Sequence, residues 1–157
     1  MNYRIKKVKR GDGIELSYEK LNKNFDTAIA EISLKTSRIS ASNLINSLHA
    51  LKEELLKMAE VKVEDEQILS VTQVNFKYSS DKGLGAQMTA ELFLKDSNEN
   101  LVIKSPVKWE DSKEVKERMS HNLLTLLNEV RYEACEFIDR EKDDQIELFQ
   151  EANKEAS

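Results

Sequence analysis

Histidine and cysteine are the side chains that most often bind metals or act as bases and nucleophiles, and this chain has few of them. The histidines are His49 and His121, and the one cysteine is Cys135. A zinc site needs three or four such ligands at close spacing, and none of these residues has such a partner nearby. No G-x-S-x-G nucleophile turn occurs either. We therefore expect no metal, no cofactor and no enzymatic activity.

Two of the four glycines lie close together, in the sequence Gly83-Leu84-Gly85. This run is too short for a P-loop, and it precedes a strand pattern instead of a helix. It predicts a hairpin turn that needs a positive φ. Small residues here would alternatively let a ligand or a partner's backbone approach closely.

Aromatic and lysine residues gather in and beside the predicted strands, a combination used by proteins that bind single-stranded nucleic acids. Phe93 is notable because it stands among the polar residues of its strand. It would either contact a ligand or pack under another element or at an oligomer interface. The candidate binding residues are Phe76, Tyr78, Gly83, Gly85, Phe93, Trp109, Lys104 and Lys108.

The elements that would position these residues include three strands. Apolar and polar residues alternate over residues 67–78, 86–95 and 101–105, and short turns join them. This pattern predicts an antiparallel meander with one apolar face. Leu69 and Val71 are out of phase with the apolar residues that follow, which predicts a β-bulge at 72–73.

Helices must cover the apolar face of such a sheet. One stripe at helical spacing runs over residues 44–58. A second helix is predicted to begin with Asp111 as N-cap and Glu114 completing a capping box, and to continue towards Asn153. Cys135 falls in this helix and is interpreted as a small buried hydrophobe. Residues 14–36 fit either a helix or two strands.

Several patches resemble a group of small uncharacterised proteins encoded by tailed bacteriophages and prophages. The patches are residues 48–53, 71–76, 83–90, 101–106 and 133–138. The resemblance implies a phage setting, near early or recombination genes, and no known activity. It also implies that residues 14–36 form two strands. The expected fold is therefore α+β, an antiparallel sheet of about five strands covered by two helices, the C-terminal one long.

Length and charge limit the remaining possibilities. The 157 residues suit one domain, and the formal charge of −5 argues against charge-driven binding to duplex DNA. No apolar run is long enough to span a membrane, and no signal peptide is visible, so we expect a cytoplasmic protein. Residues 1–13 are predicted to be a flexible basic arm, and residues 140–157 a flexible charged tail.

The C-terminal helix is longer than a domain of this size needs, so we expect a homo-oligomer. The first functional hypothesis is a non-enzymatic phage accessory protein that acts by binding. It would inhibit or sequester a host component, such as a defence protein or a small nucleotide. The alternative is a single-stranded nucleic-acid-binding protein of phage recombination or replication.

Overall fold

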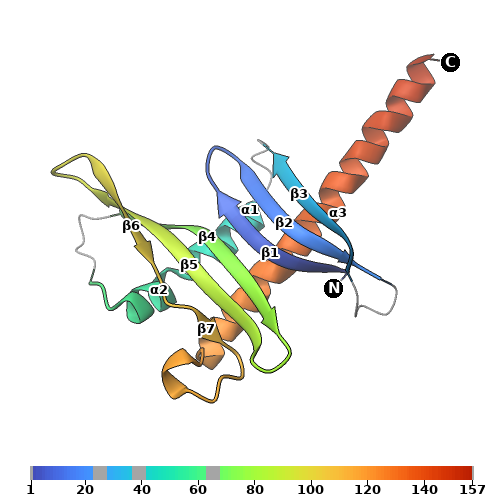
Figure 1. The fold of residues 1–157 in the computed structure, drawn as a ribbon. Coiled ribbons are helices and arrows are strands. Elements are labelled where there is room, and N and C mark those ends of the chain that lie inside the picture. Colours follow the sequence, from blue (N-terminus) through green and yellow to red (C-terminus); the bar gives the residue numbers. More distant parts are fainter. Residues whose placement is uncertain (1, 23–27, 37–41, 63–67, 157) are drawn as a thin grey trace.

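The computed structural model describes residues 2–22, 28–36, 42–62 and 68–156 (Figure 1). The fold is α+β, as predicted. Its strands are β1 (Tyr3–Arg10), β2 (Ile14–Leu21), β3 (Ala28–Thr36), β4 (Ile68–Ser79), β5 (Gly83–Leu94), β6 (Glu99–Lys104) and β7 (Lys108–Trp109). Its helices are α1 (Ser42–His49), α2 (Lys52–Ala59), a 3-10 turn η1 (Val115–Glu117) and α3 (His121–Ala156).

All strand pairs are antiparallel, and the sheet has the order β3-β2-β1-β4-β5-β6 with β7 paired to β5. The sheet therefore has seven strands where about five were expected. Residues 14–36 contribute two strands, as the resemblance implied. The meander β4-β5-β6 and the bulge between Val71 and Gln73 are also confirmed.

The prediction of a flexible basic arm over residues 1–13 is wrong for Tyr3–Arg10. These residues form β1, which lies between β2 and β4 in the middle of the sheet. Tyr3, Ile5 and Val8 are buried and anchor the strand in the core. A register shift between Ile5 and Lys7 breaks the alternation, so the apolar residues are not evenly spaced and the sequence looks like a charged tail.

The core lies on one side of the sheet only. Alternate residues of β1, β2, β4 and β5 point towards α1, α2 and α3, and they form one cluster with the buried helix residues. Figure 1 shows α1 and α3 behind the sheet, with α3 crossing its back and extending past β3. The helix predicted over residues 44–58 is two shorter helices, and the buried Leu51 lies between them.

The long C-terminal helix is confirmed, but its predicted start at Asp111 is wrong. Helix α3 begins at His121, and the Ser120 Oγ accepts a hydrogen bond from the backbone N–H of Leu123 at 3.0 Å. The preceding segment is held against the sheet instead. The Met119 N–H donates to the Trp109 carbonyl at 2.9 Å. This attachment to β7 prevents the segment from continuing the helix backwards.

A buried carboxylate ties this helix start to α2. Glu54 is only 6% exposed, and its Oε1 accepts a hydrogen bond from the Asn122 Nδ2 at 2.7 Å. The Ser120 hydroxyl lies 3.4 Å from the Glu54 Oε2. A carboxylate at a helix N-terminus also interacts favourably with the helix dipole. Glu54 is therefore interpreted as a structural residue. In the described part of the chain, no helix is long and apolar enough to span a bilayer.

Candidate functional site

In the described part of the chain the helices cover one side of the sheet, and no helix lies over the other side. On β4 and β5 the residues that alternate with the core residues point to this side, and all of them except the buried Gly85 are partly or fully exposed. We call this side of the sheet the open face. Its central residues are Lys7, Lys9, Gln73, Asn75, Gln87 and Thr89. A sheet face rich in amides and lysines, with no layer over it, is suited to binding a polar partner.

Strand register aligns these side chains in rows across the sheet. In one row Lys9 of β1 lies opposite Gln73 of β4, Gln73 opposite Thr89 of β5, and Thr89 opposite Lys104 of β6. In the next row Lys7 lies opposite Asn75, and Asn75 opposite Gln87. Directly opposed residues share a face of the sheet. Amide and hydroxyl groups therefore form a central strip with lysines at its ends.

Trp109 lies on the open face at one end of β5. A Cβ atom added to Gly85 would come within 2.6 Å of the Trp109 ring carbons. Gly85 lies opposite Lys77, an exposed open-face residue, so the indole rests on the sheet beside Lys77. The ammonium of Lys82 stands 5.4 Å from the ring centroid. Gly85 therefore makes room for an aromatic side chain of the same chain, and the close approach of a ligand or of a partner's backbone stays a prediction.

Phe93 lies on the open face at the other end of β5. It is partly exposed and lies opposite Ile68 of β4 and Asn100 of β6. From Gly85 to Phe93 the strand spans about 26 Å, at about 3.3 Å per residue. Between the aromatic side chains of Trp109 and Phe93 the open face of β5 carries Gln87, Thr89 and Glu91. Bases of a single strand stack on aromatic side chains.

Ion pairs divide the open face into a neutral half and a basic half. On β1 and β2, Glu19 pairs with Lys6 at 2.8 Å and with Arg4 at 3.0 Å, and Glu15 pairs with Lys7 at 3.0 Å. The pKa of Glu19 is held below its usual range mainly by the hydrogen bond from Lys6. Toward β4, β5 and β6 the lysines Lys9, Lys77 and Lys104 are exposed. In the described residues they outnumber the one exposed carboxylate on the open face of these three strands, that of Glu91 on β5.

The structure brings together only part of the predicted binding set. Gly85, Trp109, Phe93 and Lys104 belong to the open face. Gly83 is the turn residue before them, with φ at +73°. Phe76 does not belong to this surface because it is buried in the core. The last two predicted residues, Tyr78 and Lys108, make contacts within the fold. The Lys108 Nζ donates a hydrogen bond to the Lys116 carbonyl.

Tyr78 is held inside the fold where the pairing of β1 with β4 ends. Its hydroxyl donates to the Ile5 carbonyl at 2.6 Å. The guanidinium of Arg4 lies 5.3 Å from its ring centroid, and that of Arg131 lies 5.5 Å from it. Burial raises the pKa of the phenol above its usual value. Tyr78 therefore joins β1, β4 and α3 and is not offered to a ligand.

Sequence reasoning missed the two central lysines of the open face. Lys7 and Lys9 were assigned to a flexible arm, and only the pairing of β1 with β4 places them beside Gln73 and Asn75. The signal in the sequence was the pair of apolar residues Ile5 and Val8, which are buried in the structure. The bulge between Ile5 and Lys7 breaks the alternation of apolar and polar residues that is typical of a strand.

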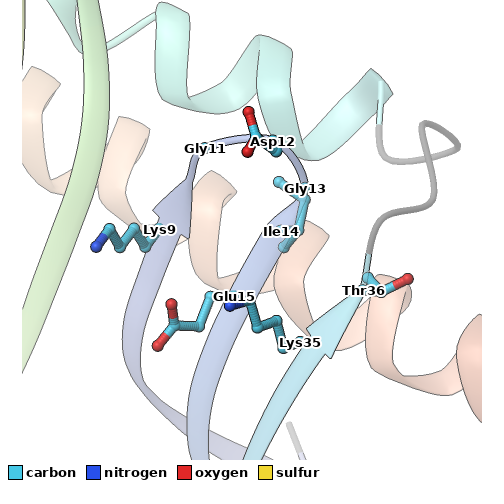
Figure 2. A pocket seen from close by; sticks show the side chains of 8 residues that line it. All are labelled: Lys9, Gly11, Asp12, Gly13, Ile14, Glu15, Lys35 and Thr36. Atoms are coloured by element: carbon cyan, nitrogen blue, oxygen red, sulfur yellow. The ribbon is translucent and has the colours of Figure 1, made fainter.

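A cavity of about 420 Å³ adjoins the open face at the turn between β1 and β2 (Figure 2). Lys9, Glu15 and Lys35 line it and are opposed across β1, β2 and β3. The Gly11-Asp12-Gly13 turn closes one end. Figure 2 shows Glu15 and Lys35 extending from neighbouring strands below this turn. Most of its lining surface is apolar, and its lining residues include no histidine or cysteine.

In the described part of the chain His49 lies on α1, whereas His121 and Cys135 lie on α3. No group of three or more His, Cys, Asp or Glu side chains in that part is placed to hold a metal ion. His49 instead contacts the Arg10 guanidinium through Nε2 at 2.8 Å.

The Cys135 thiol is buried, as predicted, and burial raises its pKa to about 11. Because the thiolate is the reactive form, we expect very slow labelling of the folded protein by an aromatic disulfide reagent near pH 8. The rate should rise as the pH approaches 11. The same protein in denaturant should label completely and fast. Absorbance of the released thiolate measures both rates, and fast labelling of the folded protein would contradict the burial of this thiol.

Comparisons with protein-family models, with curated proteins and with solved structures yield no match to this chain.

Proposed function

We propose that the protein acts by binding, without a catalytic step, and that the open face binds single-stranded nucleic acid. The observation that carries this proposal is the arrangement along β5. Trp109 lies on the sheet over Gly85 and Phe93 lies at the far end, with Gln87, Thr89 and the exposed carboxylate of Glu91 between them on β5. Such a surface stacks bases at its ends and bonds polar base edges or sugars in its centre.

Local charge supports this choice although the whole chain is acidic. The formal charge of −5 is a sum over the chain, whereas a bound strand interacts mainly with charges within about a Debye length, roughly 8 Å at physiological salt. Lys9, Lys77 and Lys104 lie within or beside the strip. These cations would contact phosphates, and the acidic remainder of the surface would disfavour duplexes that need a wider basic surface.

The test is a titration of the purified protein with a labelled mixed-sequence oligonucleotide, followed by anisotropy and by the emission of Trp109. Because the chain has one tryptophan, any quenching reports on the open face directly. We expect saturable binding to the single strand, weaker at high salt, with quenching of Trp109. The duplex of the same sequence is the control and should bind less. Absence of binding at low salt would refute the proposal.

The phage accessory role stays a prediction of its own. A protein that binds single strands fits a recombination or replication setting, which was the second of the two hypotheses from the sequence. The first hypothesis, inhibition of a host defence component, would be favoured instead if a host protein or a small nucleotide co-purified with the chain and competed with the oligonucleotide. Mass spectrometry of the material purified from the natural host distinguishes these outcomes.

A further inference from the structure

Apolar side chains are exposed at one corner of the sheet. Ile68 is 64% exposed, Leu101 is 50% exposed and Val102 is 55% exposed. Leu101 and Val102 are neighbours on β6, and Ile68 lies opposite the partly exposed Phe93 on the adjacent strands. Ile68 and Val102 face the open side of the sheet and Leu101 faces the helix side, so apolar groups are exposed on both faces of this corner. Such exposure indicates an edge that is covered in the working state of the protein.

This corner is also an edge of the sheet. Strand β6 ends the strand order, so its outer side has no neighbouring strand in the described part of the chain. Exposed edges usually carry charges or proline that prevent pairing with another chain. The other edge strand, β3, carries such charges. Glu31 is exposed near its centre, and Lys35 is exposed near its end. In β6 the centre is Leu101-Val102-Ile103, without charge or proline.

The sequence of β6 is suited to pairing with itself. In an antiparallel pair with a two-fold axis at Val102, the two Val102 side chains meet on the open face. Asn100 then lies opposite Lys104 of the second copy, and Leu101 lies opposite Ile103 of the second copy on the helix-covered face. No like charges are opposed in this register, and Leu101, the most exposed apolar residue on that face, gains an apolar neighbour.

We infer that β6 pairs with β6 of a second copy of this chain, so that the two sheets continue into one. The isologous contact is of the kind expected for a two-fold dimer. It places the two open faces side by side in one surface. This inference goes beyond the proposed function and does not rest on it. The sequence led us to expect self-association because of the long C-terminal helix, and this inference places the contact on β6 instead.

The decisive experiment is cross-linking of the Val102→Cys variant under mild oxidation, read on a non-reducing gel. Directly opposed strand residues have Cα atoms about 4.5–5.5 Å apart, which suits a disulfide. The native Cys135 is buried and should not contribute. Ser33→Cys is the matched control, because Ser33 is exposed on the open face of β3, at the other edge. We expect rapid dimer formation by Val102→Cys alone.

Light scattering tests the same inference without new disulfides. The wild-type chain should have the mass of a dimer, and Val102→Lys, which brings two like charges together, should shift the chain to monomer. Circular dichroism checks that Val102→Lys is folded. If Val102→Lys is not folded, cross-linking of Val102→Cys decides the question. A monomeric wild type, equal cross-linking of both cysteine variants, or a dimer that survives Val102→Lys would each overturn the inference. Oligonucleotide binding by a wild-type monomer would leave the proposed function standing.

Discussion

Reversing the charge of Lys9 and Lys104 together should weaken binding of single-stranded nucleic acid by roughly 30-fold or more. The two lysines stand in one cross-strand row with Gln73 and Thr89 between them. Each lost phosphate contact should cost about 1 kcal/mol or more, and the new glutamates add repulsion. The salt dependence should change as well, because each lost contact lowers the slope of log affinity against log salt by about 0.7.

Lys52→Glu with Lys62→Glu is the matched control for this experiment. These two residues lie in and just after α2, on the side of the sheet that the helices cover. Both double variants change the net charge equally, so any difference between them reports on the open face and not on total charge. Anisotropy titrations at several salt concentrations measure affinity and slope together. Equal losses in the two variants would show that binding is a non-specific effect of charge.

Replacing Gly85 by alanine should displace Trp109 from the sheet. An added Cβ would lie 2.6 Å from two carbons of the indole ring and 2.9 Å from a third. Because this is far inside van der Waals contact, the ring must move, and such overpacking costs about 1–3 kcal/mol of unfolding free energy. The ring should become more exposed to water, and its emission should shift to longer wavelength. If Trp109 stacks on a base, affinity for the oligonucleotide should fall by about tenfold or more.

Gly11→Ala is the control, because a Cβ at Gly11 would meet nothing within 4 Å. Its unfolding midpoint, emission maximum and affinity should all stay close to those of the wild-type chain. Chemical denaturation followed by circular dichroism gives the stability difference, and the emission spectrum gives the position of Trp109. A Gly85→Ala variant with wild-type stability and spectrum would show that the indole does not rest on this glycine.

Local pattern was sufficient for the elements whose alternation is regular. Strand β5 has buried residues at every second position from Leu84 to Leu92, and its pattern predicts one apolar face without any knowledge of its neighbours. The bulge between Val71 and Gln73 was predictable too, since two in-phase runs meet there. The C-terminal helix was predictable as a long helix from its apolar stripe, but its start at His121 was not predicted, and it continues to Ala156 through residues that were also interpreted as a flexible tail.

Two predictions, the helix start at Asp111 and the flexible basic arm, were wrong because a local sequence signal competed with a distant contact. Asp111 and Glu114 have the spacing of a capping box, yet the bond from the Met119 N–H to the Trp109 carbonyl holds this segment to β7. The charged residues of β1 suggested a solvated arm, yet burial of Ile5 and Val8 makes it a central strand. In both cases tertiary packing outweighs a local preference worth about 1 kcal/mol.

The amino-acid sequence by itself therefore determined the fold class, the polar side of each regular strand and the shortage of catalytic residue types. These follow from side-chain chemistry and from periods of two and 3.6 residues. Only the tertiary structure decided which strands are neighbours. The pairing of β1 with β4 joins residues far apart in the chain, and no local pattern encodes it. That pairing, with the placement of Trp109 on Gly85, turns scattered lysines, amides and aromatic rings into one surface.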